Sequence, residues 1–563
     1  MDKKIGVYVC ECGPNIKERI DIDAVLKEIS SIEEVSVVKN YSLLCSNDGK
    51  KFLAEEIKNE GITHLVVAAC SPREHEQTFM NVCEEAGLNP YLMQMVNIRE
   101  QCAWIIPDKN EATRMAIKYI RAGIHRVMLH NELFKKELSS NADVLVIGGG
   151  TSGIETSLSL AGKKRKVYLV EKEEALGGMA KRLSKILPYQ GSDLSVIEEK
   201  IKKVENNEQV EVLTSSEVTG ARGFLGNFEV DVEVRKQDED TEYREIQTGA
   251  IVVATGFDLY NPKESPHYGY GEIENVLTAL EFEENAGSGN IALKNGSPPK
   301  SVAIIHCVGR KEKGYCSKVC CLYSMKFARH VKEKIKETEV YEFYTDLCLP
   351  YKHDQAYYEE TKKEGIHFIR EDSVKVSSKN GKINIEHQPS DGEKGSQLVD
   401  MVILAPAMIP SEKASKLAEI FNLPLDETGF FKEVHEMLDP VSTPIDGVYI
   451  TGCALGPKNI PDSIIQSQAV SGKIFSTLIP GKKLEPEVRV SEVRTEFCTG
   501  CQTCLSVCFY GAISFDEVEG VSVVNEAICR GCGSCVGSCP SGAIISKHFK
   551  YKQLYQEVLE AIV

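Results

Sequence analysis

The sequence lacks several features, and each absence narrows the possible function. No stretch of the 563 residues reaches the roughly 20 consecutive apolar residues that a membrane helix needs, and the opening "MDKKIGVYVCECG" has no apolar signal-peptide core. Basic residues are outnumbered, because 66 Lys and Arg face 83 Asp and Glu, giving a net charge of -17. A nucleic-acid partner would need a clustered basic face. We therefore expect a cytoplasmic protein that works with small soluble donors or protein partners.

Cysteine, in contrast, is abundant, with 20 residues in the chain. Disulfide scaffolds are short, secreted and dense in cysteine, which this long chain is not. Metal or redox chemistry is the better interpretation. Some cysteines act only as small buried hydrophobes, and Cys83, inside the helical pattern "HEQTFMNVCEEAG", is expected to be one of these.

The carboxyl-terminal part carries the strongest signal, a C-x2-C-x2-C-x3-C run that occurs twice, as "CTGCQTCLSVC" and "CRGCGSCVGSCP". Structural zinc sites use two cysteine pairs separated by a long loop and need no third and fourth cysteine at this spacing. The segment 490–546 resembles bacterial two-cluster ferredoxins, although Phe509 stands where the first run would have a proline. In those proteins the fourth cysteine of each run binds the other cluster. The resemblance implies two [4Fe-4S] clusters in a domain at 488–563, held by Cys498, Cys501, Cys504 and Cys539, and by Cys529, Cys532, Cys535 and Cys508.

A glycine-rich segment, "DVLVIGGGTSGIETSLSLAGKKRKVYLVEKE", predicts a strand, a turn, a helix and a second strand. Gly148, Gly150 and Gly153 form G-x-G-x-x-G at the end of the first strand, and Glu171 ends the second. Such glycines allow a pyrophosphate to approach the backbone at a helix amino terminus, and the acidic residue can bind ribose hydroxyls. This context predicts a dinucleotide site.

Further motifs resemble the FAD-binding half of the thioredoxin-reductase-like flavoproteins, which have two dinucleotide domains. A late motif, "GVYITGCALGPKNIPDSIIQSQAVSGKI", has a cysteine where the family has an acidic residue, and its helix is expected to begin near Asp462. The resemblance implies FAD bound by residues 139–298 and 399–487. No C-x4-C dithiol lies near this site, so electrons must leave by another route. The additional cofactor-binding residues are Gly177, Gly178, Ala254, Thr255, Gly256, Gly452 and Cys453.

Between the two FAD parts, residues 299–398 predict a second strand-helix-strand unit, which would bind NAD(P)H in that fold. Its first loop should carry glycines, but "CVGRKEKGYCSKVCC" instead carries Cys307, Cys316, Cys320 and Cys321. Soft thiolates favour an iron-sulfur cluster and would crowd out a phosphate. The alternative is that one of the adjacent cysteines only packs. Cys348 follows the next strand, close to this predicted site, without an assigned role.

The amino-terminal part, residues 1–138, alternates strands and helices and predicts a parallel sheet. Five cysteines follow its strands, and ligands in such folds bind beyond the carboxyl ends of the strands. One further cluster is therefore expected, although some of these cysteines can be core residues. The five are Cys10, Cys12, Cys45, Cys70 and Cys102.

Together with "AACSPREHEQTF", "NPYLMQMVNIREQCAW" and "GCALGPKNIPDSIIQSQA", these motifs resemble the A subunit of heterodisulfide reductase over nearly the whole chain. The resemblance implies an FAD- and iron-sulfur-dependent oxidoreductase subunit with a homodimeric core. It also implies partner subunits, with ferredoxin or a hydrogenase- or formate-dehydrogenase-type electron donor. In methanogens such complexes perform flavin-based electron bifurcation.

Two other functions stay open from the sequence, an NAD(P)H-dependent oxidoreductase and a non-catalytic iron-sulfur relay. Longer relatives carry an inserted ferredoxin domain after "GGMAKRLSKILP", which this chain lacks. Fewer clusters offer fewer routes for electrons. The sequence therefore supports electron transfer itself better than full bifurcation. We expect no catalytic side chain beyond the cofactor-binding ones.

Overall fold

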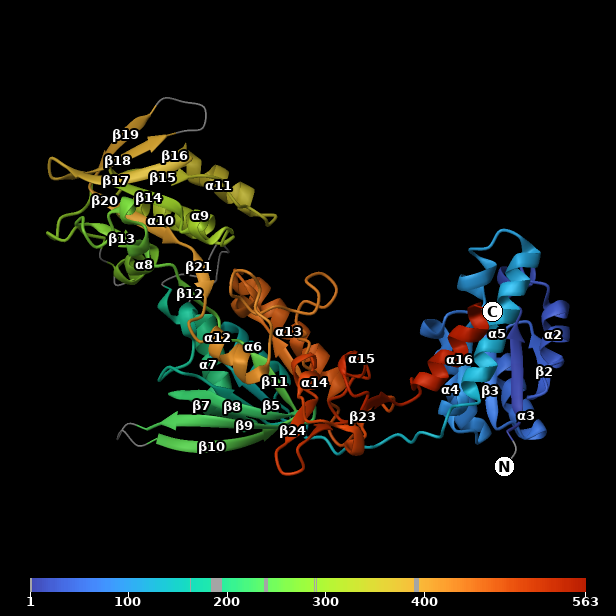
Figure 1. The fold of residues 1–563 in the computed structure, drawn as a ribbon. Coiled ribbons are helices and arrows are strands. Elements are labelled where there is room, and N and C mark those ends of the chain that lie inside the picture. Colours follow the sequence, from blue (N-terminus) through green and yellow to red (C-terminus); the bar gives the residue numbers. More distant parts are fainter. Residues whose placement is uncertain are drawn as a thin grey trace. The chain divides into compact units, whose positions relative to one another are not determined.

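The computed structural model describes residues 3–162, 164–183, 195–236, 241–287, 289, 291–388 and 394–562. The chain forms two compact units (Figure 1), the first made of Met1–Leu138 and Glu485–Val563 and the second of Ser139–Leu484. The point after residue 188 where longer relatives carry an insertion lies outside the described residues. Among the helices described, none combines the length and the apolar character that crossing a membrane requires.

The amino-terminal part of the first unit is the predicted parallel sheet. Its strand order is β2 (Val35–Tyr41), β1 (Ile5–Cys10), β3 (His64–Ala69) and β4 (Met93–Asn97). Side chains alternate between the two faces of a strand. Thus Ile5, Val7 and Val9 pack on α2 (Ile22–Ser30) and α5 (Lys109–Val127), whereas Tyr8 and Cys10 pack toward α3 (Asn47–Glu60) and α4 (Pro72–Ala86). Cys83 lies fully buried on α4, as expected.

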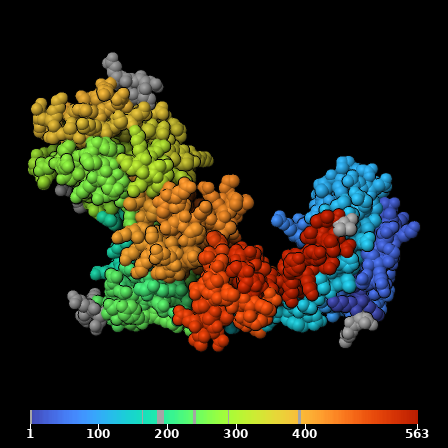
Figure 2. All heavy atoms as spheres, in the orientation of Figure 1, coloured from blue at the N-terminus to red at the C-terminus, as the bar shows by residue number. Residues whose placement is uncertain are grey.

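The carboxyl-terminal part of the first unit is a small duplicated fold. It contains two antiparallel pairs, β23 (Ser491–Val493) with β26 (Ile544–Ser546), and β24 (Ile513–Asp516) with β25 (Val521–Val524). A short helix stands in each half, α14 (Thr503–Ser506) and α15 (Ser534–Ser538). The last helix, α16 (Tyr551–Ile562), packs against α5 (Figure 2), where His125 Nδ1 and Glu560 Oε1 are 3.0 Å apart.

The second unit contains the glycine-rich motif in a five-stranded parallel sheet. The strand order is β22 (Val448–Ile450), β11 (Ala250–Val253), β5 (Val144–Ile147), β6 (Val167–Val170) and β7 (Val210–Leu213). One face is covered by α6 (Thr151–Leu160) and α13 (Ile460–Thr477). The other face packs on an antiparallel sheet of β8 (Ser216–Phe224), β9 (Asn227–Arg235) and β10 (Thr241–Thr248).

A second parallel sheet holds the cysteine-rich loop. Its order is β13 (Val276–Thr278), β20 (Met401–Pro406), β14 (Ser301–Val308), β15 (Glu339–Tyr344) and β16 (Ile366–Arg370), and α10 (Cys320–Lys334) follows β14. Because β13 and β20 belong to it, this sheet extends beyond the expected range of 299–398 on both sides. The antiparallel strands β17 (Ser373–Lys379), β18 (Lys382–Gln388) and β19 (Gly395–Val399) adjoin it, and β12 (Phe257–Leu259) pairs with β21 (Met408–Pro410) where the chain leaves and returns.

Candidate functional site: a dinucleotide cavity bordered by cysteines

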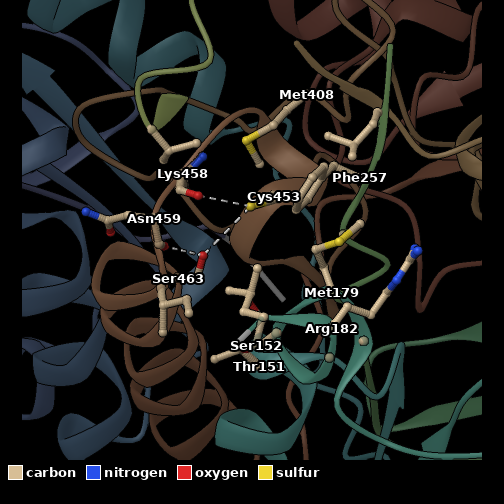
Figure 3. Close-up of a pocket in the computed structure, with 18 of the residues that line it drawn as sticks. Thr151, Ser152, Met179, Arg182, Phe257, Met408, Cys453, Lys458, Asn459 and Ser463 are labelled. Atoms are coloured by element: carbon tan, nitrogen blue, oxygen red, sulfur yellow. Dashed lines mark hydrogen bonds between the residues drawn. The ribbon is translucent and has the colours of Figure 1, made fainter. Parts of the chain in front are cut away.

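A cavity of about 750 Å³ lies within the second unit. One side is formed by the β5–α6 turn, the end of β6, the segment after β11 and the start of α13. The other side is formed by α8 (Ala279–Gly287), the start of α10 and the end of β20. Figure 3 shows Met179 and Phe257 from the first side facing Met408 from the second. This volume suits a cofactor of dinucleotide size.

The glycine turn is shaped by close backbone approaches. Gly148 has φ +109°, and a Cβ there would lie 2.4 Å from the carbonyl oxygen of Ala254. At Gly153 a Cβ would lie 1.8 Å from the carbonyl oxygen of Gly148, so the first turn of α6 can approach β5 only without a side chain. Nothing lies within 4 Å of the position that a Cβ would take at Gly150, which leaves the helix amino terminus open to an anionic group.

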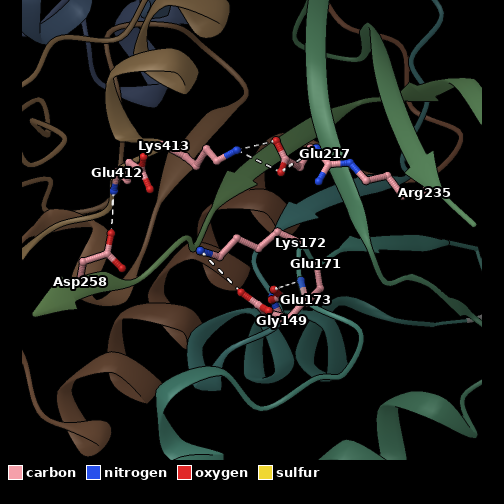
Figure 4. Close-up of polar contacts among 9 residues, drawn as sticks. All are labelled: Gly149, Glu171, Lys172, Glu173, Glu217, Arg235, Asp258, Glu412 and Lys413. Atoms are coloured by element: carbon pink, nitrogen blue, oxygen red, sulfur yellow. Dashed lines mark hydrogen bonds and ion pairs between the residues drawn. The ribbon is translucent and has the colours of Figure 1, made fainter. Parts of the chain in front are cut away.

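Glu171 stands directly after β6 and is only 6% exposed. Its Oε2 accepts a hydrogen bond of 2.5 Å from the Gly149 N–H, and its Oε1 accepts one of 2.9 Å from the Glu173 N–H (Figure 4). The carboxylate is thus fixed at the edge of the glycine turn. A second polar group in the wall is Thr255 Oγ1, which is buried and has no hydrogen-bond partner within the described residues. An unsatisfied hydroxyl at this position is consistent with a binding site for a polar ligand.

The late motif forms the opposite end of the cavity. Asn459 caps α13 by accepting a hydrogen bond from the Asp462 N–H, so the helix begins at Ile460, two residues earlier than expected. Cys453, at the position where the flavoprotein resemblance led us to expect an acidic residue, has its Sγ 3.4 Å from the Lys458 carbonyl oxygen and 3.9 Å from Ser463 Oγ (Figure 3). Burial raises the pKa of the Cys453 thiol. The side chain therefore offers a neutral hydrogen-bond donor at this end of the cavity.

A buried ion pair also lines the cavity. Lys326 on α10 binds the carboxylate of Glu283 on α8, and the two side chains are only 10% and 2% exposed. A buried pair is strongly destabilised when one partner is removed, because the other charge stays desolvated. The pair therefore fixes a positive and a negative group in the wall that faces the glycine turn.

The four predicted cysteines of the middle loop lie together at the carboxyl end of β14. Cys307 has φ +58° at the end of the strand, and Cys316 lies in the turn before α10. The adjacent Cys320 and Cys321 are 4% and 1% exposed and hydrogen-bond each other, so neither points away from the group. The hydrogen bond from Cys320, aided by His306, lowers the pKa of Cys321 well below its ordinary value. A stabilised thiolate is the form that binds iron.

The eight carboxyl-terminal cysteines lie in the two crossed groups that the ferredoxin resemblance implies. Cys539 joins Cys498, Cys501 and Cys504 around one small cavity. In the other group, the thiol of Cys535 interacts electrostatically with Cys529, Cys508 and Cys532. Both donor sets consist of thiols alone, which suits iron-sulfur chemistry. No three described His, Cys, Asp or Glu side chains anywhere are placed to hold a single metal ion.

At the amino-terminal sheet, four of the five predicted cysteines lie near one another. Cys10 interacts electrostatically with Cys12 and Cys45, and Cys70 interacts with Cys12. The guanidinium of Arg99 donates to Cys12 Sγ at 3.4 Å. Cys102 differs from the other four. It is fully buried among the residues beneath α2 and α5, and burial alone raises its pKa to about 12.

Comparison with known proteins identifies the family. Residues 142–469 match the family described as pyridine nucleotide-disulphide oxidoreductase, and residues 497–543 match the 4Fe-4S dicluster domain. A Methanothermobacter thermautotrophicus protein, described as the A subunit of H(2):CoB-CoM heterodisulfide,ferredoxin reductase, is 34% identical over 100% of this chain and 98% of its own. This chain belongs to the A-subunit family of heterodisulfide reductases. The expected fold class is thereby confirmed.

Other members of this family are similar to the same extent. One from Methanosarcina acetivorans, described as the A subunit of Ferredoxin/F(420)H(2)-dependent CoB-CoM heterodisulfide reductase, is 32% identical over 91% of this chain and 75% of its own. A solved thioredoxin reductase of T. acidophilum is 17% identical, covers 60% of this chain and 98% of its own, and has a TM-score of 0.42. As a heterodisulfide reductase family member the chain is an oxidoreductase, and its two matched domains imply FAD and [4Fe-4S] clusters.

Sequence reasoning missed several polar residues of this heterodisulfide-reductase-family cavity. Glu283 and Lys326 had no distinguishing signal, because charged residues on a helix usually mark a solvated face. Tyr351, whose hydroxyl binds the Asp462 carboxylate, lies in a loop with no recognisable motif. Only the tertiary fold brings these side chains to the cavity.

Proposed function

We propose that this chain is the FAD- and iron-sulfur-containing electron-transfer subunit of a heterodisulfide-reductase-like complex. In its finer form the proposal includes flavin-based electron bifurcation or confurcation involving ferredoxin. The names of the two relatives, which include ferredoxin, support this choice. Partner subunits, a hydrogenase- or formate-dehydrogenase-type donor and a homodimeric core complete the proposed assembly.

One observation carries the proposal, namely that the cysteine loop also forms a wall of the dinucleotide cavity. Lys318, Val319, Leu322 and Tyr323 line the cavity, and they alternate along the chain with Cys316, Cys320 and Cys321. When bound, FAD exchanges electrons in pairs or singly, whereas a [4Fe-4S] cluster carries one at a time. Residues that hold both groups in one short segment allow electrons to pass between them.

The side chains bind and orient the cofactors. The backbone N–H groups of the glycine turn at the start of α6 would donate hydrogen bonds to the pyrophosphate, and the Glu171 carboxylate would accept them from the ribose hydroxyls. The amino terminus of α13, capped by Asn459, would hold its partial positive charge near the flavin when FAD is bound. The Lys326–Glu283 pair supplies a fixed charge pair in the same wall.

Four cluster sites follow from the cysteine groups. Two are the crossed sets of the carboxyl-terminal domain, the third is the middle loop, and the fourth is the amino-terminal edge. We leave Cys102 out of the last set because it packs in the core. The ligands of the third and fourth sites would be Cys307, Cys316, Cys320 and Cys321, and Cys10, Cys12, Cys45 and Cys70.

The first test is an analysis of iron, acid-labile sulfide and flavin on the anaerobically purified chain. Four clusters and one FAD predict about 16 iron atoms per flavin, at four per cluster. About 8 would contradict both the middle and the amino-terminal sites and leave only the ferredoxin domain. It would also reopen the middle unit as a nicotinamide site.

The second test follows the flavin spectrum while reductants are added anaerobically. Reduction by low-potential ferredoxin is expected, because the ferredoxin-like domain and the middle cysteines offer a route for single electrons. Hydride transfer from NADH would favour an NAD(P)H-dependent enzyme instead. A flavin that no donor reduces would indicate a passive relay.

A further inference from the structure

The middle cysteine site contains one more thiol than a four-iron cluster needs. Cys348 lies in the loop after β15, and β15 is the parallel neighbour of β14, whose end carries Cys307. Because parallel neighbours end at the same sheet edge, the topology brings this loop to the other four cysteines. Nothing in the sequence motifs assigned Cys348 a role.

The contacts of Cys348 are made with two specific members of the group. Its backbone N–H donates to Cys321 Sγ at 3.4 Å, and its thiol hydrogen-bonds the side chain of Cys316. Tyr323, Leu347 and Ala405 pack around Cys320, Cys321 and Cys348 in one small apolar cluster. Cys348 is therefore part of the group and is held there by backbone and side chain.

The five cysteines differ in how firmly the fold holds them. Cys307 is part of β14, and Cys320 and Cys321 form the first turn of α10. Cys316 and Cys348 instead lie in loops, and both are partly exposed. Side chains in loops can shift without disturbing a strand or helix. These two thiols are thus the pair that can move, and they also touch each other.

From these contacts, and resting on the cluster proposed above, we propose that Cys316 and Cys348 are interchangeable ligands for one iron of the middle cluster. In the exchange Cys348 loses its thiol proton to the leaving Cys316 sulfur, with which it is hydrogen-bonded. One iron–sulfur bond forms as the other breaks, and no electron is gained or lost. One of the two cysteines then always remains as a free thiol beside the cluster.

The decisive experiment compares alanine variants, which remove the sulfur without supplying an oxygen ligand. Cys316→Ala and Cys348→Ala should each keep about 16 iron atoms per flavin. The double variant should fall to about 12 or show a three-iron cluster by electron paramagnetic resonance. Cys307→Ala is the matched control, because Cys348 hydrogen-bonds Cys316 and Cys321 and should not replace a ligand on β14.

Two outcomes distinguish a failure of the ligand exchange from a failure of the middle cluster itself. Loss of the cluster in Cys316→Ala, with Cys348 intact, would overturn the exchange while leaving the proposed function standing. A wild-type chain with about 8 iron atoms would contradict the middle cluster itself, and the exchange with it. Flavin content reports whether each variant is folded.

If the double variant fails to retain flavin, the wild-type holoprotein supplies the answer. Anaerobic alkylation followed by peptide mass spectrometry should label about one thiol per chain at this site, divided between Cys316 and Cys348. Label on Cys348 alone would show a bystander thiol and would refute the exchange.

Discussion

The second unit contains two strand-turn-helix elements of the same topology but of opposite loop chemistry. Between β5 and α6 the turn is short and built of glycines, whereas the segment from the end of β14 to the first turn of α10 is longer and carries cysteines. A phosphate is bound by backbone N–H groups, so side chains must be absent, as at Gly148 and Gly153. An iron-sulfur cluster is bound by side chains, so they must be present. On the proposed assignment, the fold supplies the position and the loop decides the ligand.

Both elements place their ligand-binding groups at the start of a helix. At α6 the open space at Gly150 leaves the amino terminus available to an external anion. At α10 the first residues are themselves the thiols, and the pKa of Cys321 is lowered by Cys320 and His306. On the proposed assignment, the same helix position would receive a cofactor anion in one element and supply cluster thiols in the other.

The largest expected effect comes from Gly153→Ala. Its Cβ would meet the Gly148 carbonyl oxygen at 1.8 Å, so the turn must open and FAD should be lost completely. Flavin absorbance per chain measures the loss, and the iron of the cysteine loop should remain. Gly472→Ala, which has open space on α13, is the control. Full flavin content in Gly153→Ala would contradict the claim that the β5–α6 turn must lack side chains to bind its ligand.

A second prediction concerns the ion pair in the wall between the two elements. Lys326→Met removes the cation that binds the buried Glu283 carboxylate, which should lower the free energy of unfolding by about 3–5 kcal/mol. Urea unfolding measures this change. Lys203→Met, in an exposed pair with Glu199, should leave it nearly unchanged. Equal effects of the two variants would contradict a structural role for the buried pair.

Glu171→Gln should have a smaller effect, confined to the first element. Hydrogen bonds to a charged group contribute about 1.5–3 kcal/mol, so FAD affinity should fall by about tenfold or more. Titration of the flavin-depleted chain with FAD gives the dissociation constant. Glu173→Gln, whose side chain is 68% exposed, is the control. An unchanged affinity in Glu171→Gln would show that the carboxylate only braces the turn.

For the element formed by β14 and α10, we expect no response of the flavin to NADH. NADH should neither bind tightly nor reduce the flavin, because thiols occupy the turn where its pyrophosphate would lie. Stopped-flow absorbance after anaerobic mixing measures this, with dithionite as the positive control. Rapid reduction by NADH would show that the two turns bind similar ligands after all.

The parts of the site formed by residues close together in the sequence were predictable, because the spacing of those residues identifies them. The cysteine runs, the glycine turn and the strand before each of them are fixed within a few residues. The crossed grouping of Cys508 and Cys539 came from the ferredoxin resemblance, and the structure brings both to the expected groups.

What could not be predicted depends on packing between distant segments. Cys102 follows β4 just as Cys70 follows β3, yet the π-helical turn Arg99–Ala103 directs it into the core. Strand β20 comes after three antiparallel strands but inserts beside β14, which no periodicity indicates. Glu283 and Lys326 meet only because α8 and α10 cover the same side of that sheet.

The pairing of β12 with β21 brings together the two ends of the region that carries the cysteines. Phe257 lies opposite Pro410 and Leu259 opposite Met408, so everything between these strands begins and ends at neighbouring points. Closing a long loop costs little more conformational entropy than closing a short one. We therefore expect the cysteine-bearing region to be separable from the rest of the second unit. Joining residue 259 to residue 408 through a short turn should leave the five-stranded sheet that contains β5 able to fold alone.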